Sequence, residues 1–247
     1  MRRQVFAFSG VLQPQPGERG NRPLLEHVLA IGAARRVTGG PVRLCYVPTA
    51  VGDDPAAVSA YQRVFGGRDD VVLSVLRLFP QPSTPDLRTH LLTQDVVLVE
   101  GGSVVNLVAV WRAHGLPAVL RECWEAGVVL AGPSAGGMCW HVGGATDAWS
   151  DEQSGRLAPF TEGLGLLPHS FGVHDDMAGQ PRRAVYRRMV GAGELPPGYA
   201  TEDGVGLHYL GTELAEAVTV RPGARAWRVD PDGAGGVVER AITPRQV

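Results

Sequence analysis

The stretch VVLAGPSAGGMCW, residues 128–140, begins with four apolar residues and continues into a glycine, a proline, a serine and two more glycines. An apolar run of this length is typical of a buried strand, and the small residues after it indicate a tight turn into the next element. Residues 132–136 match G-x-S-x-G, the pattern of a nucleophile elbow, in which a strained strand-to-helix turn exposes the serine oxygen. Ser134 is therefore a candidate nucleophile, and the alternative is a tight loop with an incidental serine.

Strands and helices alternate along the chain before this stretch. Such alternation requires crossover connections, so it predicts a mostly parallel sheet covered by helices on both faces, which is a three-layer α/β sandwich. In such sheets ligands bind at the carboxyl ends of the strands, which places residues 100–102 and 132–137 at one crevice. The expected strands cover 4–8, 42–50, 71–79 and 95–102. The expected helices cover 23–37, with Asn21 as a possible cap, 55–65, opened by Asp53, Asp54 and Pro55, then 103–114 and 118–126, and one more opens at Thr84 and Pro85.

The C-terminal part of the chain has a different pattern. From Ala217 to Ile242, short β-rich runs are separated by Pro-Gly and Asp-Gly signals, which predicts antiparallel strands at the edge of the sheet. No repeat or low-complexity linker divides the chain, and its length of 247 residues fits one domain. We therefore expect a single catalytic domain over residues 1–247.

Charge and cysteine content exclude several classes of protein. The 23 basic residues are all arginine and stand against 25 acidic residues, so no basic field favours nucleic acid. Because the chain has no lysine, a Ser-Lys dyad is excluded. Three cysteines without metal-ligand spacing indicate reduced thiols, and the short apolar stretch near the N-terminus is too brief for a signal peptide or a membrane span. We expect a cytoplasmic protein that binds neither nucleic acid nor a membrane.

A serine nucleophile needs a base, and histidine is the usual one near neutral pH. His169 and His174 lie in the segment GLGLLPHSFGVHDD, residues 163–176, and His174 is preferred because it closes the apolar run. His141 is expected on the same helix as Ser134, about two turns further on and too far for a direct hydrogen bond. Cys139 is expected to pack within that apolar helix. The histidine segment matches no zinc-ligand spacing, so no metal site is expected.

The acid that orients the histidine has candidates on both sides of it. The order serine, acid, histidine would use Asp147, Asp151 or Glu152. The order serine, histidine, acid would use Glu202 or Asp203. The residue pattern by itself leaves this choice open.

Four segments together resemble peptidase E and its relatives, including cyanophycinase: VEGGSVVNL (99–107), AGPSAGG (131–137), GLGLLPHSFGVHDD (163–176) and YATEDGVGL (199–207). The resemblance covers most of the chain and implies a serine peptidase on the flavodoxin-like, class I glutamine-amidotransferase-like α/β fold. It implies Ser134 as nucleophile, His174 as base and Asp203, the acid followed by glycine, as the third member of a triad. It also implies oxyanion donors at the backbone N–H groups of Gly102 and Ala135, and no cofactor.

The chain departs from the family at positions that bear on the substrate. Peptidase E has glutamate where this chain has Asp203, and the family commonly has asparagine where this chain has Ser103, near the substrate amide. Peptidase E cleaves dipeptides with an N-terminal aspartate and holds that carboxylate with an arginine, which the resemblance matches to Arg182. The alternative reading of Arg182 is one member of an arginine-rich, solvated helix face.

The resemblance thus predicts a peptidase E-type serine hydrolase that cleaves small peptides, Asp-X dipeptides among them, through an acyl-enzyme. One alternative is an esterase or amidase on the same triad, and another is an inactive member of the fold that binds a small ligand or partner. The oligomeric state stays open, with a homodimer as one option.

Overall fold

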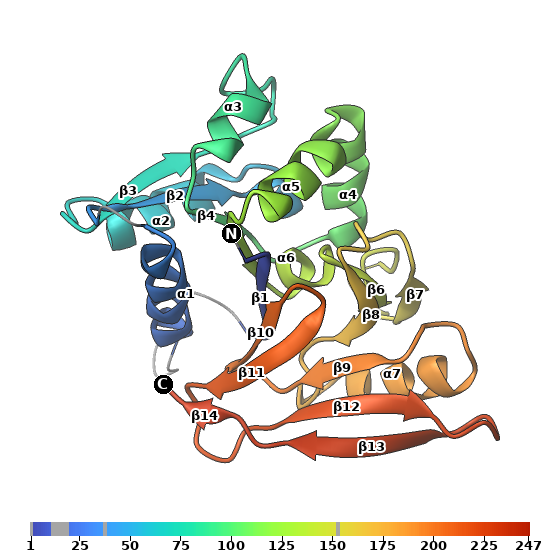
Figure 1. Cartoon of the computed structure of the whole chain (residues 1–247). Helices are drawn as coiled ribbons and strands as arrows, with labels where there is room; N and C mark the ends of the chain where they lie inside the picture. Colours follow the sequence, from blue (N-terminus) through green and yellow to red (C-terminus); the bar gives the residue numbers. More distant parts are fainter. Residues whose placement is uncertain (1, 11–19, 37–38, 152–153) are drawn as a thin grey trace.

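A central sheet of eight strands organises the computed structural model, which describes residues 2–10, 20–36, 39–151 and 154–247 (Figure 1). The strands β1, β5, β4, β2 and β3 are parallel, whereas β10 and β11 pair antiparallel on the other side of β1. This arrangement confirms the predicted, mostly parallel sheet. In spatial order the strands are β14 (Arg245–Gln246), β11 (Glu213–Thr219), β10 (Val205–Leu210), β1 (Gln4–Phe8), β5 (Val129–Pro133), β4 (Val96–Val99), β2 (Val42–Val47) and β3 (Val71–Val75).

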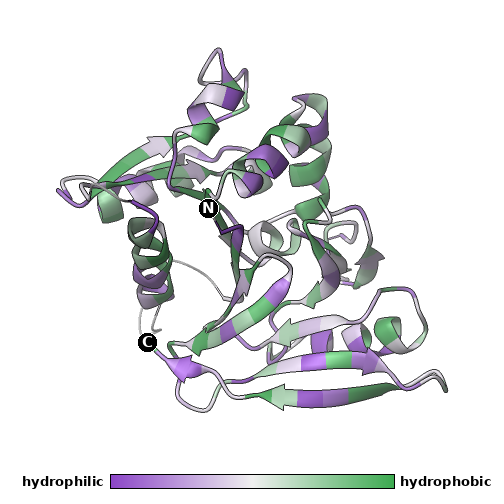
Figure 2. Cartoon of the chain, viewed as in Figure 1, coloured by the Kyte–Doolittle hydropathy of each residue, from purple (hydrophilic) through white to green (hydrophobic). Residues whose placement is uncertain are grey.

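Helices cover both faces of the central sheet. Alternate residues of β1 separate the two cores, because Phe6 and Phe8 pack in the cluster with α1 and α2, whereas Val5 and Ala7 belong to the cluster with α4 and α5. Strands buried on both faces are apolar nearly throughout, as the green central strands of Figure 2 show. The three-layer α/β sandwich is therefore confirmed. The helices are α1 (Arg22–Ala34), α2 (Pro55–Phe65), α3 (Leu87–Leu92), α4 (Val104–Ala113) and α5 (Leu116–Glu125), with the short 3-10 turn Thr49–Val51 before α2.

A second sheet of six strands packs beside the first and was not expected from the sequence. The prediction that all β-rich runs after Gly211 join the edge of the central sheet is right for β11, which pairs with β10, but wrong for β12 and β13. Strand β12 pairs with β9 instead, and β14 occupies the free side of β11. The strands in order are β13 (Val237–Ile242), β12 (Ala226–Pro231), β9 (Gly198–Thr201), β8 (Leu167–Gly172), β6 (His141–Thr146) and β7 (Ala158–Phe160), with α7 (Arg182–Gly191) packed on β12 and β6.

One hydrophobic core joins the two sheets. The cluster that contains Val5 and Leu130 of the central sheet also contains Leu167 and Phe171 of the second sheet. A contiguous core of this kind is typical of a single domain, and one catalytic domain over residues 1–247 stays a prediction. No helix in the described part of the chain is both long and apolar enough to span a membrane.

Several helix ends differ from the sequence prediction. Of the two aspartates expected to open α2, Asp54 is the cap, since its Oδ1 accepts the N–H of Ala56 at 2.9 Å. Asn21 precedes α1 without capping it, because its side chain donates to the carbonyl oxygen of Ser9 at 3.1 Å. The predicted helix over 23–37 ends at Ala34, and Val37 lies outside the described residues. The helix expected from Thr84 starts at Leu87, where the Asp86 side chain supplies the cap, and α5 starts two residues before the predicted Ala118.

The helix after Ser134 is much shorter than expected. Helix α6 (Ala135–Met138) ends after four residues, and His141 begins β6, so the prediction of Ser134 and His141 on one helix is wrong. Glycine is required at 143 and 144 of this strand, because a Cβ at either position would overlap the carbonyl oxygen of Phe160 or Phe171 from the neighbouring strands. Cys139 accordingly lies at the end of α6, fully buried, and not within a long helix.

Candidate active site

Ser134 sits in a strained turn between β5 and α6. Its backbone has φ +49° and ψ −116°, a left-handed conformation that non-glycine residues rarely adopt. Such strain persists only where the surrounding structure imposes it, and it clusters at functional sites. The Ser134 N–H donates to the carbonyl oxygen of Phe8 at 2.9 Å, which ties the turn to β1. The turn therefore has the geometry predicted for a nucleophile elbow.

The two flanking glycines are required by close backbone approach. A Cβ at Gly132 would lie 2.6 Å from the carbonyl oxygen of Val99, and one at Gly136 would lie 2.8 Å from that of Glu100. Neither position has space for any side chain, because both oxygens belong to the backbone of the neighbouring β4 segment. The G-x-S-x-G spacing thus follows from packing of the elbow against β4.

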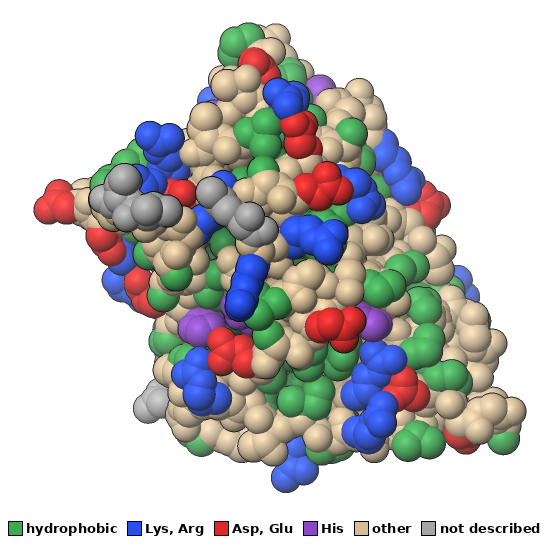
Figure 3. All heavy atoms as spheres, in the orientation of Figure 1, with side chains coloured by type: hydrophobic (Ala, Val, Ile, Leu, Met, Phe, Trp, Pro, Cys, Tyr) green, Lys and Arg blue, Asp and Glu red, His purple; other side chains and the backbone are tan. Residues whose placement is uncertain are grey.

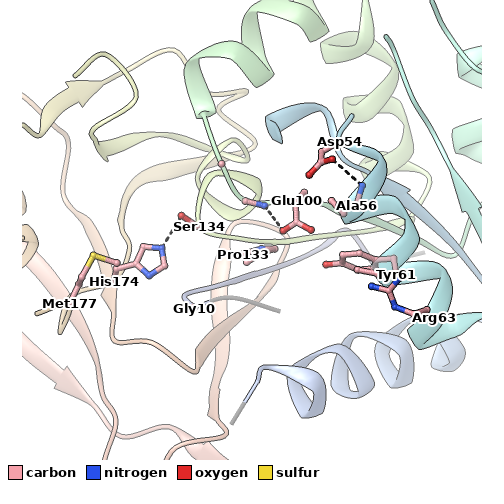
Figure 4. Close-up of a pocket in the computed structure, with 14 residues that line it drawn as sticks. Gly10, Asp54, Ala56, Tyr61, Arg63, Glu100, Pro133, Ser134, His174 and Met177 are labelled. Carbon is pink, nitrogen blue, oxygen red and sulfur yellow. Dashed lines mark hydrogen bonds between the residues drawn. The ribbon is translucent and has the colours of Figure 1, made fainter. Parts of the chain in front are cut away.

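His174 follows β8 and reaches the serine from the second sheet. Its Nε2 lies 3.0 Å from Ser134 Oγ, and Figure 4 marks this hydrogen bond. The backbone of His174 is also left-handed, with φ +57°, and its N–H donates to Ser9 Oγ at 3.1 Å. Ser9 in turn contacts Thr201 Oγ1 at 2.6 Å, so buried hydroxyl groups from β9 and the end of β1 fix the histidine backbone.

Asp203 lies in the turn between β9 and β10, on the far side of the histidine ring. Its Oδ1 lies 2.5 Å from His174 Nδ1, and its own N–H donates to Asp176 Oδ1 at 2.8 Å. Glu202 points elsewhere, because its Oε2 accepts the N–H of Arg225 at 3.0 Å. Of the two neighbouring acids, the structure brings Asp203 to the histidine.

The remaining candidates for acid and base lie away from Ser134. Asp147 pairs with Arg182, Asp151 accepts the N–H of Ser154 at 2.8 Å, and Glu152 lies outside the described residues. His169 lies in β8, where its ring meets that of Tyr199 edge-on.

Two other reactive side chains near the elbow are buried in forms unsuited to catalysis. Burial lowers the pKa of His141 to about 3, and its Nδ1 bonds the carbonyl oxygen of Gly137 at 2.9 Å. Burial also raises the pKa of the Cys139 thiol well above its ordinary value, which disfavours the thiolate that a cysteine nucleophile requires. Both side chains are therefore packing groups.

A cavity of about 600 Å³ opens beside Ser134 and His174. Glu100, Tyr61 and Arg63 also line it, together with the backbone of residues 101–102, and Figure 4 shows these groups around one space. The sequence placed residue 100 at this crevice without giving Glu100 a role, and it gave no indication of Tyr61. The available signal was an acid directly after the apolar strand VVLV, at the carboxyl end where ligands bind.

Of the two expected oxyanion donors, Gly102 lines this cavity, and Ala135 directly follows Ser134. Gly102 has φ +133°, and a Cβ there would lie 2.5 Å from the carbonyl oxygen of Ala50. No group in the described part of the chain accepts the Gly102 N–H, whereas the Gly101 N–H donates to Glu100 Oε1 at 2.9 Å. Ala135 is the first residue of α6, where backbone N–H groups have no partner within the helix.

The two residues expected to contact substrate do not line the cavity. Ser103 caps α4, because its Oγ accepts the N–H of Asn106 at 3.2 Å. Arg182 is nine-tenths buried at the start of α7 and is engaged within the protein: its Nη2 lies 2.8 Å from Asp147 Oδ2, and its Nε donates to Gln180 Oε1 at 2.7 Å. Both residues thus have internal partners.

Comparison with known proteins agrees with the fold and the family expected from the sequence. The family model of peptidase family S51 matches residues 18–217. A protein of Bacillus subtilis (strain 168), the uncharacterized peptidase YgaJ, is 39% identical over 187 residues, which cover 76% of this chain and 77% of that protein.

Two solved structures share the fold at 18% identity. A peptidase from an acI-B1 actinobacterium superposes with a TM-score of 0.69, over 99% of this chain and 95% of the other. A protein named as a peptidase E from Listeria monocytogenes EGD-e superposes with a TM-score of 0.58, over 90% of this chain and all of the other.

Proposed function

This chain belongs to peptidase family S51 and is a serine peptidase, and we propose that it cleaves small peptides with Ser134 as nucleophile, His174 as general base and Asp203 as the acid that orients the histidine. The observation that carries this proposal is the continuous series of contacts at one cavity, 3.0 Å from Ser134 Oγ to His174 Nε2 and 2.5 Å from His174 Nδ1 to Asp203. These distances are within hydrogen-bond reach, as a nucleophile, a base and an orienting group require.

The reaction would proceed through an acyl-enzyme. With its proton on Nδ1, His174 donates to Asp203, and its Nε2 accepts the Ser134 proton as Oγ attacks the scissile carbonyl carbon. The carbonyl oxygen then carries a negative charge, for which the N–H groups of Gly102 and Ala135 are the proposed donors. The imidazolium gives its proton to the leaving amine, and water, deprotonated by the same histidine, releases the acid and regenerates Ser134.

Cleavage of Asp-X dipeptides stays a prediction from the resemblance. It would require Arg182 to exchange Asp147 for the carboxylate of the substrate, because the guanidinium is paired in the structure described here. The small cavity beside Ser134 supports short peptides as substrates, and the mixture of arginine and acidic side chains on the face in Figure 3 offers no basic field for a polyanion.

Labelling and digestion test this function directly. Wild-type protein should react with a fluorophosphonate at one residue and should cleave members of a short-peptide library, as read by mass spectrometry. Ser134→Ala should lose labelling and cleavage together while its melting temperature stays within a few degrees. Ser154→Ala, an exposed serine outside the cavity, serves as the matched control and should keep both. Cleavage by Ser134→Ala would refute the assignment of the nucleophile.

A further inference from the structure

Glu100 is a carboxylate withdrawn from water without a cationic partner. It follows β4 directly and lines the cavity of Ser134, where it accepts hydrogen bonds from Tyr46 Oη at 2.6 Å and from the Gly101 N–H at 2.9 Å. Burial raises its pKa above the ordinary value for glutamate. Within the described ranges, no arginine or histidine lies within 4.0 Å of its carboxylate.

Two of the three buried aspartates in the described residues, Asp95 and Asp175, have arginine partners, whereas Asp53 accepts the backbone N–H groups of Leu78 and Phe79. Asp95 contacts Arg35 and Arg36, and Asp175 contacts Arg183 and Arg187. Charges taken out of water are ordinarily paired in this way, because an unpaired one loses its hydration without compensation. At Glu100 the open side faces the cavity, so a cation that enters the cavity would supply the missing partner.

Tyr61 also lines this cavity, and its hydroxyl lies beside the Glu100 carboxyl group. The residue is only 4% exposed, and its hydroxyl helps to lower the pKa of Glu100 against the larger effect of burial, although within the described residues it forms no hydrogen bond of ordinary geometry. The ring is fixed by stacking on Tyr46, with centroids 3.7 Å apart, and Figure 4 shows the hydroxyl pointing toward the side of the cavity where Glu100 and Ser134 lie. A buried hydroxyl without such a hydrogen bond is costly, so it also favours a ligand that can donate to it.

We propose that Glu100 and Tyr61 form a subsite that binds a protonated primary amine of the peptide substrate. An ammonium group has three N–H donors, of which the Glu100 carboxylate and the Tyr61 hydroxyl oxygen would accept two. This inference rests on the proposed function, because it places the subsite beside the scissile bond. Glu100 and Gly102, the proposed oxyanion donor, line the same cavity, and the α-amine of a peptide lies close to its first carbonyl group, so both groups of the substrate can be held there together.

Two sources of the amine fit this chemistry, the free N-terminus of the substrate and a lysine side chain. Four diphenyl phosphonate probes that modify Ser134 separate them: the leucine analogue with a free amine, the same analogue acetylated, and the acetylated analogues of lysine and norleucine. The rate of Ser134 modification is measured for each probe by mass spectrometry. A free-amine leucine probe faster than its acetylated form points to the N-terminus, and a lysine probe faster than norleucine points to the side chain.

Glu100→Gln removes the charge while keeping an oxygen that can accept the Gly101 N–H. In this variant, the preferred amine probe should modify Ser134 about 10- to 100-fold more slowly than in wild type, the scale of a hydrogen bond to a charged group. The neutral probes should modify Ser134 at rates within about threefold of wild type. Tyr61→Phe should lower the rate with the same amine probe by about 3- to 10-fold. An equal loss with all four probes, or no loss with any, would overturn the amine subsite.

A matched control is Asp54→Asn, which removes a charge from an exposed residue of the same cavity and keeps an oxygen that can cap α2. It should lower the rates with the amine probes by about threefold at most, because an exposed charge is screened by water, and the rates with the neutral probes by less. A loss as selective as that of Glu100→Gln would overturn the assignment to Glu100, because it would show a general effect of net charge. If wild-type Ser134 reacts with neither the fluorophosphonate nor any probe, the proposed function itself fails. Reaction without a preference for amines refutes only this subsite.

Discussion

Asp203→Asn tests the proposed triad with the least change in shape. A carboxylate can only accept hydrogen bonds, so Asp203 keeps the His174 proton on Nδ1 and leaves Nε2 free to accept from Ser134. Asparagine offers an N–H at the same place, which favours the opposite tautomer, with the proton on Nε2. That form of the histidine cannot act as the base, so we expect turnover to fall while the fold is retained.

The size of the loss follows from the position of the carboxylate. Disabling the residue that orients a triad histidine costs on the order of 10⁴ in kcat, which corresponds to about 5.4 kcal/mol of activation free energy. The Asp203 side chain is 34% exposed, so water can replace part of its interaction with the histidine. We therefore expect kcat to fall by about 10³- to 10⁴-fold, or about 4 to 5.4 kcal/mol.

The measurement is kcat and kcat/KM on one peptide from the library digest, together with a thermal melt of each variant. Glu202→Gln is the matched control, because Glu202 is adjacent in sequence but bonds the Arg225 N–H instead of the histidine. It should stay within about threefold of wild type, the range of a change outside the reacting groups. A larger loss in Glu202→Gln than in Asp203→Asn, or a comparable loss in Asp147→Asn, would refute the assignment of the acid.

Three further outcomes follow from the packing and charges of the site. Gly136→Ala should lower the free energy of unfolding by about 3 kcal/mol or more, measured by urea denaturation, since its Cβ would overlap the backbone of β4; an unchanged midpoint would contradict that packing. In thermal melts, Glu100→Gln should be more stable than wild type at pH 8 and equal to it near pH 4. Folding raises the pKa of Glu100, so the wild-type protein loses stability as the pH rises from the unfolded pKa through the folded pKa of this group, whereas glutamine does not titrate. A stability difference that is the same at both pH values would contradict this. Asp-Leu and Asn-Leu should be cleaved with kcat/KM values within about threefold of each other, because Arg182 is paired with Asp147; a preference above tenfold for Asp-Leu that Arg182→Met abolishes would show that Arg182 changes partner.

The elbow could be predicted from the sequence because its constraints are local. Gly132, Ser134 and Gly136 lie within five residues, and their spacing is required by one turn that packs against one neighbouring strand. The alternation of strands and helices in the first half is similarly local, because each crossover connects strands of the same sheet. These local features predict the central sheet correctly, and they place Ser134 in a turn that is strained in the structure.

The second sheet could not be predicted in the same way. The sequence predicts β12 as a strand between two turns, but the residues of that strand do not determine whether it pairs with β11 or with β9. Partner choice depends on the whole assembly, in which β14, formed by Arg245–Gln246, already occupies the side of β11. The short α6 was missed for a related reason, since Gly143 and Gly144 show their packing against other strands only in the folded chain.

Ion pairs between residues far apart in the sequence determine which charged groups of the site are free to bind a substrate. These pairs could not be predicted from the sequence. Arg182 and Asp147 are 35 positions apart, and their ion pair occupies the guanidinium that the resemblance would give to a substrate aspartate. Glu100, two residues before the proposed oxyanion donor Gly102, accepts two hydrogen bonds, and no arginine or histidine of the described residues forms an ion pair with it. Among the charged side chains that line the cavity, the carboxyl groups of Glu100 and Asp54 outnumber the guanidinium of Arg63, so a second carboxylate from an N-terminal aspartate would be repelled by Glu100, whereas an amine would be attracted. The electrostatics of the cavity therefore favour selection for a positive group on the substrate, even where the catalytic residues follow the pattern of peptidase E.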